Sequence, residues 1–299
     1  MKKKKTSLGD WILNIFLGLF FTLFTLICIY PFYYLIINTI SANDISANGQ
    51  IMFLPKGIHF QNYIDVFKIP DLASAALVSL GRTVLGTIGA VLGAAYLGFM
   101  FTQQKMWARK FWYRFTIITM YFNAGLIPWY ITMRNLHLTN NFLAYILPAI
   151  VQPFNIILVK TYMESISPAL QEAAEIDGAS VMKVFMKIML PLAKPIMATI
   201  AIFAAVGQWN SFQDTLILMT KPALYTLQFL LYQYINQASS LAAMIKNGTV
   251  ISTSSLATMQ TPTSIRMTVS VVVILPILLV YPFFQKYFVK GIMIGSVKG

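Results

Sequence analysis

Long apolar segments alternate with short polar segments along the chain. A membrane helix needs about 20 apolar residues to cross a hydrocarbon layer of roughly 30 Å. On this measure the sequence predicts six membrane spans, at residues 12–40, 73–101, 112–133, 142–164, 196–219 and 265–288. Polar segments separate them at residues 41–72, 102–111, 134–141, 165–195 and 220–264. The pattern therefore predicts an all-α, polytopic membrane protein, with a kink in the first span near Pro31.

The composition supports the same class of protein. Of the 299 residues, 58% are hydrophobic and 10% are charged, and the mean hydropathy is +0.69. Soluble domains carry about 25% charged residues, so a soluble enzyme, a secreted domain and a disordered chain are excluded. The single cysteine, Cys28, leaves no intrachain disulfide. His59 and His137 are far apart and belong to no metal-binding motif, so no metal site is expected.

The basic residues predict the orientation of the chain. The formal net charge is +13, and Lys and Arg gather at the ends of the apolar segments, which is not the pattern of a nucleic-acid-binding patch. With the N-terminus inside, inner segments hold 15 of the 22 Lys and Arg residues, while outer loops hold five. Arg82 and Arg266 fall near outer helix ends. Cytoplasmic loops collect positive charge, so both termini are predicted to be cytoplasmic.

Glycines in the second span bear on how it packs. Gly89 and Gly93 are four residues apart and so lie on one face of a helix. Small residues at this spacing let helix backbones approach closely in a membrane. We predict a packing seam here, with a hinge as the alternative.

Segment 165–195 is predicted to form two short helices at the inner surface. Ser167-Pro168 favours a helix start, since serine caps helices and proline suits the first helical position. Asp177-Gly178 favours a helix end, because glycine adopts the left-handed conformation at low cost. A second helix is predicted from 179 to 190, with a break or kink at Pro191 and Pro195 before the fifth span.

Within this segment, seven residues have the spacing of the EAA motif of ATP-binding-cassette (ABC) importer permeases: Glu172, Ala173, Ala174, Gly178, Ile188, Leu190 and Pro191. The stretch EAAEIDGA, from Glu172 to Ala179, resembles the carbohydrate-uptake branch of that family, which includes the maltose permeases. Residues 122–138 and 209–217 are similar to the third and fifth helices of this branch. Residues 290–299 are similar to the C-terminus of the smaller maltose-type subunit. The resemblance covers about residues 70–299.

The resemblance implies a type I ABC importer permease fold and a division of the chain into three parts. Residues 1–72 would hold the N-terminal tail, the first span and an outer loop. Residues 73–289 would form the transporter domain with its coupling loop at 165–195, and residues 290–299 a cytoplasmic tail. The chain would be a multi-pass subunit of a bacterial plasma membrane importer for an oligosaccharide or polysaccharide fragment.

The resemblance also implies partners. The chain would pair with a second permease as a heterodimer in membrane lipid, with two ATP-binding subunits and an extracellular or periplasmic solute-binding protein, and without nucleic acid. ATP and Mg would be held by the separate ATPase, so this chain would bind no cofactor and catalyse no reaction. The residues implied to couple it to the ATPase are Glu172, Ala173, Ala174, Asp177, Gly178, Ile188, Leu190 and Pro191. The alternative for Glu172 is that it stabilises its own helix dipole, worth roughly 0.3–1 kcal/mol.

Polar and aromatic residues inside the spans are candidates for a substrate path. They are Asn123 in the third span, Gln152 and Asn155 in the fourth, and Gln208, Trp209, Asn210, Gln213 and Asp214 in the fifth. Polar groups at bilayer depth are costly and are retained for function or to bond helices together. Amides and carboxylates can bind sugar hydroxyls, and aromatic faces can cover sugar rings. Alternatively these groups bridge helices, with Asp214 paired to Arg82 or Arg266.

Two other functions remain open from the residues alone. An ABC permease of the same superfamily could carry an amino acid, a peptide or phosphate. A secondary transporter or a membrane-embedded enzyme would instead act as a single chain, using intramembrane ionisable pairs or metal ligands. Only Asp214 fits the first of those two requirements.

Overall fold

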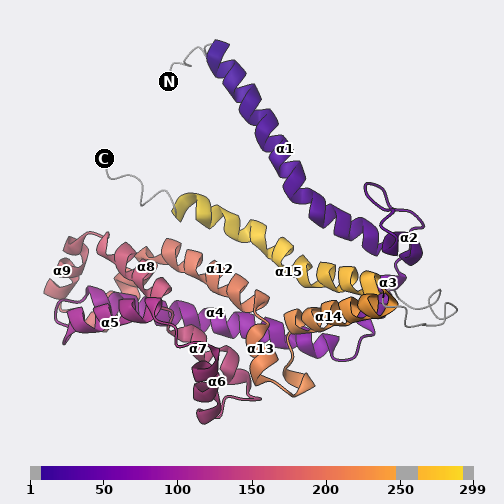
Figure 1. Cartoon of the computed structure of the whole chain (residues 1–299). Coiled ribbons are helices and arrows are strands. Elements are labelled where there is room, and N and C mark those ends of the chain that lie inside the picture. Colours follow the sequence, from indigo (N-terminus) through magenta and orange to yellow (C-terminus); the bar gives the residue numbers. More distant parts are fainter. Residues whose placement is uncertain (1–7, 247–261, 292–299) are drawn as a thin grey trace. The chain divides into compact units, whose positions relative to one another are not determined.

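The computed structural model describes residues 8–246 and 262–291, and throughout these residues the regular elements are helices (Figure 1). The basic run at residues 2–5, the predicted cytoplasmic tail from residue 292 onwards and residues 247–261 of the predicted outer loop lie outside the described part. The chain divides into two compact units. One takes Met1–Ile69 and Gln233–Val273, and the other takes Pro70–Tyr232 and Ile274–Gly299.

The first unit is built on the long apolar helix α1 (Leu8–Thr39), which continues through Pro31. Its side chains are exposed from Gly9 to Tyr33, as expected of a helix that meets lipid or another subunit, whereas Ile37, Asn38 and Thr39 near its end are buried. The segment after it, predicted only as a polar loop, contains α2 (Asn43–Ala47) and α3 (Gln61–Phe67). Asn62 fastens this segment to the end of α1, because its Nδ2 donates to the Thr39 carbonyl at 2.9 Å.

The second unit is organised around α4 (Leu72–Thr102), which contacts α7 (Leu147–Ile150), α8 (Pro153–Glu164) and α12 (Lys194–Asn210). A Cβ atom added to Gly93 would lie 2.2 Å from the Ile150 carbonyl oxygen, and one added to Gly89 would lie 3.1 Å from Ile150 Cγ1. The packing seam predicted for these glycines is therefore confirmed. Nearer the end of α4, Phe99, Ile156 and Val159 form part of the buried core.

The predicted third span, residues 112–133, is not one helix. It consists of α5 (Arg109–Tyr121) and α6 (Leu126–Asn135), separated by extended residues. Asn123 stabilises the break, because its Oδ1 accepts the Gly125 N–H at 2.8 Å, and Gly125 has a φ of 89°. A local side-chain bond of this kind competes with the helix, and a hydropathy pattern does not register it.

Other predicted elements are also interrupted. The fourth span begins with a 3₁₀ turn (Phe142–Tyr145) followed by α7 and α8, and the fifth ends at α12, after which α13 (Gln213–Leu218) and a further 3₁₀ turn (Pro222–Leu224) follow. The predicted outer segment 220–264 contains the helix α14 (Leu227–Lys246). The last predicted span lies within α15 (Pro262–Gly291).

Among the described residues, three helices are long and apolar enough to cross a membrane: Gly9–Thr39, Leu72–Thr102 and Phe142–Glu164. The pair Val181–Leu192 and Lys194–Asn210 would make a fourth, bent by 77° at its break. This bend confirms the kink predicted at Pro191 and Pro195. The structure thus shows a polytopic helical protein, and within its described residues the six predicted spans are not confirmed as six uninterrupted helices.

Candidate functional site

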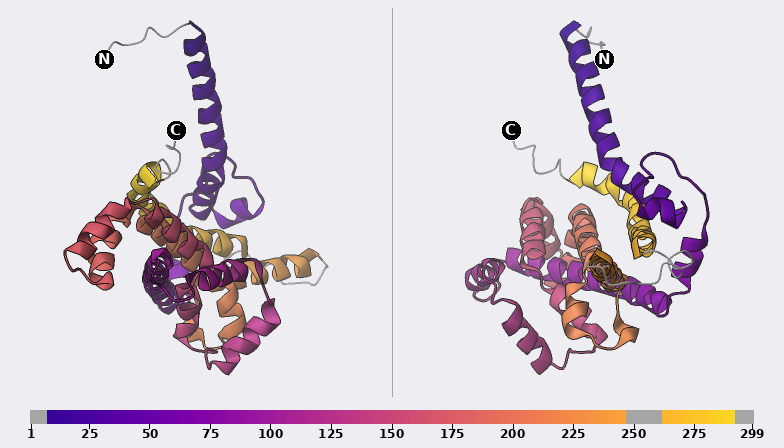
Figure 2. Two further views of the ribbon diagram at one scale, coloured as in Figure 1. Left: turned by 90° about the vertical axis from the view of Figure 1, so that its left-hand side faces the viewer. Right: turned by 45° about the vertical axis from the view of Figure 1, so that its right-hand side comes forward.

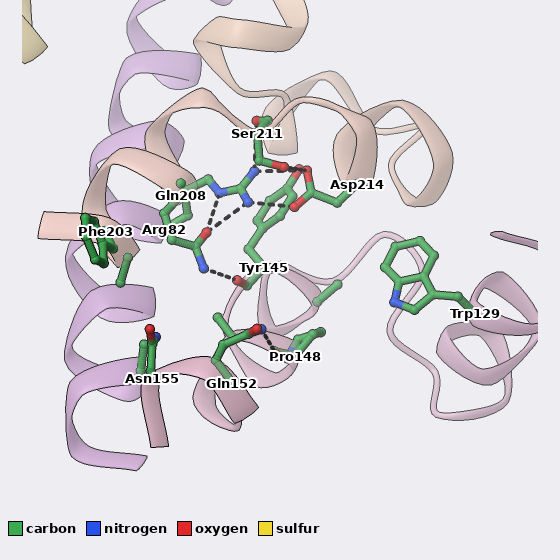
Figure 3. A pocket seen from close by; sticks show the side chains of 15 residues that line it. Arg82, Trp129, Tyr145, Pro148, Gln152, Asn155, Phe203, Gln208, Ser211 and Asp214 are labelled. Atoms are coloured by element: carbon green, nitrogen blue, oxygen red, sulfur yellow. Dashed lines mark hydrogen bonds and ion pairs between the residues drawn. The ribbon is translucent and has the colours of Figure 1, made fainter. Parts of the chain in front are cut away.

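The second unit contains a cavity of about 370 Å³ (Figure 3). It is enclosed by α4, α6, α7, α8, α12 and α13 together with the turn at Phe142–Tyr145. Its polar and aromatic lining consists of Arg82, Trp129, Tyr145, Gln152, Asn155, Phe203, Gln208, Ser211 and Asp214. Because these residues come from segments far apart in the sequence, the cavity exists only once the helices have packed.

Arg82 dominates one wall of the cavity and is only 2% exposed. Its Nε and Nη2 donate to Gln208 Oε1 at 3.0 and 2.9 Å, and its Nη1 and Nη2 donate to the Asp214 carboxylate at 3.0 and 2.6 Å. Nη1 also donates to the Ser211 carbonyl at 3.3 Å. These contacts occupy the five N–H groups of the guanidinium. The pairing of Asp214 with Arg82, one of the two alternatives from the sequence, is confirmed.

Tyr145 extends this network across the unit. Its ring centroid lies 4.4 Å from Arg82 Cζ, and its carbonyl accepts from Gln208 Nε2 at 3.1 Å. Its hydroxyl donates to the Leu224 carbonyl at 2.8 Å and lies 3.0 Å from Thr215 Oγ1. Asp214 and Gln208 are therefore structural ties between α4, α12 and α13 as well as parts of the cavity wall.

The rest of the cavity lining offers both amide groups and aromatic rings. Gln152 Nε2 donates to the Pro148 carbonyl at 3.0 Å, which leaves its Oε1 directed at no residue drawn in Figure 3. Asn155 is buried at the cavity wall and makes no hydrogen bond to the other residues drawn. Trp129 and Phe203 contribute aromatic rings to the lining, and Figure 3 shows Trp129 apart from the other three. Such a surface suits a ligand with hydroxyl groups and flat apolar faces.

Four of the eight residues named as candidates for the substrate path, Gln152, Asn155, Gln208 and Asp214, line this cavity. The other four lie elsewhere. Asn123 is exposed at the break between α5 and α6, Gln213 is exposed on α13, and Asn210 accepts from Gln228 Nε2 at 3.1 Å. Trp209 lines a separate apolar cavity of about 400 Å³ on another side of α12.

Sequence reasoning did not place Trp129, Tyr145 or Phe203 at a site. Each is one aromatic residue among many in an apolar chain, and no spacing pattern distinguishes it. Arg82 carried a clearer signal, since an arginine within an apolar helix requires a partner. The sequence suggested that partner but not the role of Arg82 in a cavity wall.

The EAA segment forms α9 (Pro168–Ile176), which projects from the rest of the second unit near α5 (Figures 1 and 2). The helix begins at Ser167-Pro168 as predicted, although the Ser167 side chain makes no capping bond. It ends at Asp177, where Gly178 has a φ of 75°. The Gly178 N–H donates to the Glu175 carbonyl and the Ala179 N–H to the Ala174 carbonyl, at 3.1 and 2.9 Å. This is a Schellman motif, and it confirms the predicted glycine joint.

The second predicted helix of this segment is also present. It consists of α10 (Val181–Val184), a π-helical turn (Phe185–Met189) and α11 (Leu190–Leu192), and Ser180 Oγ accepts the Lys183 N–H at its start. Val184 and Phe185 are buried in the core. Ile188 and Leu190 are half-buried and Pro191 is exposed, so this part of the motif anchors the segment to the unit.

The two faces of α9 differ in their surroundings. Glu172, Ala173 and Ile176 are exposed, the last by 86%, and Asp177 is exposed at the helix end. Ala174 instead packs against the core, on the same face as Gln171. The exposed face is open to contact with another subunit.

Comparison with known proteins identifies the family. Residues 87–294 match the family described as "binding-protein-dependent transport system inner membrane component". The protein LplC of Bacillus subtilis is 35% identical over 273 residues, covering 91% of this chain and 90% of LplC. The polygalacturonan/rhamnogalacturonan transport system permease protein YtcP of the same bacterium is 31% identical over 280 residues, covering 94% and 96%.

A solved structure agrees over nearly the whole chain. It is the crystal structure of a bacterial ABC transporter involved in the import of the acidic polysaccharide alginate. The TM-score is 0.82 at 28% sequence identity, with 96% of this chain and 100% of that chain covered. Permeases of this family are transport subunits that bind no cofactor and leave catalysis to other chains. The chain therefore belongs to the family of binding-protein-dependent transport system inner membrane components, and is a multi-pass ABC importer permease.

Proposed function

We propose that this permease forms, with a second permease, the translocation path for an oligosaccharide or polysaccharide fragment delivered by a binding protein. The observation that carries this proposal is the cavity lining, which combines the amides of Gln152 and Asn155 with the aromatic rings of Trp129 and Phe203. Amides bind sugar hydroxyls, and aromatic rings cover the apolar faces of sugar rings. The names of YtcP and of the alginate transporter, both concerned with polysaccharides, point to the same class of solute.

The remaining architecture follows from the sequence. The chain is a six-span subunit with both termini in the cytoplasm, in which α5 with α6 and α15 supply spans that are interrupted or kinked. Hydropathy and the excess of Lys and Arg in the inner segments support this arrangement. Two ATP-binding subunits complete the complex, and each permease docks its EAA loop on one of them.

The exposed face of α9 is the docking surface for the ATPase in this proposal. Glu172, Ala173 and Asp177 are exposed there, and Gly178 sets the angle at which the chain leaves the helix. The half-buried Ile188 and Leu190 hold the second part of the loop on the permease, and the exposed Pro191 is available for contact with the ATPase. Glu172 then meets donor groups of the ATPase rather than serving its own helix alone.

Uptake by the complete reconstituted complex tests the solute class. Radiolabelled trisaccharides derived from polygalacturonan, arabinan and alginate are offered with ATP, beside histidine, a dipeptide and phosphate. We expect ATP-dependent uptake of at least one saccharide, reduced at least about fivefold by Asn155→Ala with assembly unchanged. Uptake of only a non-saccharide solute would contradict the proposal, and ATP-independent uptake by this chain alone would favour a secondary transporter.

A further inference from the structure

The inner face of α9 is fastened to the turn that follows α4. Gln171 Nε2 donates to Gln103 Oε1 at 3.0 Å, and Gln103 Nε2 donates in return to Gln171 Oε1 at 3.4 Å. Gln103 is 8% exposed, so water cannot readily replace this partner. The two amides therefore form a reciprocal, part-buried link between segments 68 residues apart in the sequence.

A second, exposed contact lies beside this link. Lys105 Nζ is 3.2 Å from Glu175 Oε2, and Gln171 Nε2 also donates to Glu175 Oε1 at 3.0 Å. The hydrogen bond from Gln171, followed by the hydrogen bond and charge of Lys105, lowers the pKa of the Glu175 carboxyl. Because the Lys105 side chain is 87% exposed, solvent screens this ion pair and the buried amides remain the principal tie.

The turn held by α9 is continuous with the helix that forms the cavity wall. α4 is an unbroken helix of 31 residues ending at Thr102. It carries Arg82, which is hydrogen-bonded to Gln208 on α12 and to Asp214 on α13. At 1.5 Å per residue, Arg82 and Thr102 are about 30 Å apart along the axis. Because α4 is a single unbroken helix, a displacement of the turn at Gln103 also displaces the cavity wall at Arg82.

The covalent route from α9 to the cavity wall formed by α12 is less direct. Towards the C-terminus the chain passes the Gly178 joint, a π-helical turn and a bend of 77° before it reaches α12. Each of these interruptions can absorb part of a movement. The route through Gln171 and Gln103 crosses one pair of side chains and then follows a single straight helix.

We propose that Gln103 and Gln171 form a clamp through which the coupling helix α9 moves α4 and, with it, the cavity wall. Both are positioning residues for the coupling of ATP hydrolysis to import. Gln171 and Glu175 face the permease, whereas Glu172 and Ala173 face outwards, so one helix carries a docking face and a transmitting face. The clamp rests on the proposed function, since it needs an ATPase to displace α9.

The experiment compares variants in the complete reconstituted complex. Gln171→Leu and Gln103→Leu each remove both hydrogen bonds of the clamp, because leucine can neither donate nor accept one. Gln171→Lys keeps a donor for both Gln103 Oε1 and Glu175. Gln61→Leu is the matched control, because Gln61 makes the same i,i+4 amide-to-carboxylate bond to Asp65, at 2.8 Å, without joining two elements of the transporter core.

The first quantity measured is the import ratio, the number of saccharide molecules imported per ATP hydrolysed. The second is the rate at which a maleimide labels Phe203→Cys in the cavity. Labelling is measured without nucleotide and after trapping with ATP and vanadate. Cys28→Ser serves as the background for labelling. We expect both leucine variants at positions 103 and 171 to lower the import ratio at least about fivefold. They should also abolish most of the nucleotide-dependent change in labelling. Gln171→Lys and Gln61→Leu should stay within twofold of the wild type.

The outcomes separate the clamp from the proposed function. A wild-type complex that imports no saccharide rejects the solute class, while the labelling change still tests the clamp. The clamp is overturned if the leucine variants keep both the wild-type import ratio and the wild-type nucleotide-dependent change in labelling. A proportional loss of hydrolysis and import, at an unchanged ratio, also overturns it, because the contact would then only hold the fold. Equal defects in Gln171→Lys and Gln171→Leu would do the same.

Discussion

Arg82 shows how a membrane helix accommodates a full charge. Its five N–H groups are matched by Gln208, Ser211 and Asp214, and its guanidinium lies over Tyr145. A buried arginine is tolerated under such conditions because each lost water contact is replaced. The sequence raised this pairing as an alternative, but only the packing of α4 against α12 distinguishes Arg82 from Arg266 as the partner of Asp214.

Removing only one charge of this pair should cost more than removing both. Asp214→Ala leaves the Arg82 charge buried without its counter-ion, and we expect a loss of about 3–5 kcal/mol in stability. The double variant Arg82→Met/Asp214→Leu should recover at least half of that loss. Thermal unfolding of the detergent-solubilised protein measures both. A double variant no more stable than Asp214→Ala would show that the pair is not the source of the effect.

At the scale of elements, the coupling segment was predictable and the interrupted spans were not. The limits of α9, its glycine joint and the bend after α11 follow from Ser, Gly and Pro, residues with strong local preferences. The break between α5 and α6 depends on the Asn123 side chain finding the Gly125 N–H, which an apolar count does not detect. The sequence named polar candidates for the path but could not say which of them face the cavity. That depends on how the helices pack, which decides which face of each helix points inwards.

The joint at Gly178 allows a test that separates backbone conformation from bulk. A Cβ atom added there would meet no atom within 4 Å, so a larger side chain does not clash within this chain. At a φ of 75° a branched residue should still cost about 1–2 kcal/mol, whereas asparagine tolerates this region. We expect Gly178→Val to reduce binding-protein-stimulated ATP hydrolysis and import, and Gly178→Asn to retain both. Insertion into the membrane is measured in parallel, and equal activity of the two variants would contradict the conformational argument.

At the scale of the whole molecule, the sequence alone indicated the family, because a motif of 20 residues has a spacing that composition cannot imitate. It also indicated a membrane protein, since apolar runs of sufficient length have no other common explanation. The number of continuous spans was less predictable. Inside a protein, side chains and neighbouring helices can satisfy a broken helix, so Phe142–Glu164 and residues 112–133 tolerate interruptions that leave their hydropathy unchanged.

The orientation can be tested by labelling single cysteines in whole cells. A cysteine at Ser180, beside α10, should react with a membrane-impermeant maleimide only after permeabilisation, because the proposed topology places the coupling segment in the cytoplasm. A cysteine at Ser254, which lies outside the described residues, should react in intact cells. Both expectations follow from the 15 basic residues assigned to inner segments against five in outer loops. The reverse pattern at either position would contradict the proposed topology.

The contact between Gly93 and Ile150 gives α4 the mechanics of a lever. The Ile150 carbonyl sits so close to Gly93 that not even a Cβ atom fits between them, and we infer that α4 pivots about this contact. This fulcrum lies about 16 Å from Arg82 and about 15 Å from Gln103 along the helix axis, at 1.5 Å per residue. Because the two arms are nearly equal in length, a displacement of α4 at Gln103 would move Arg82 by a similar distance in the opposite direction. In the proposed topology, closing the cytoplasmic side and opening the outer side would then be one and the same motion.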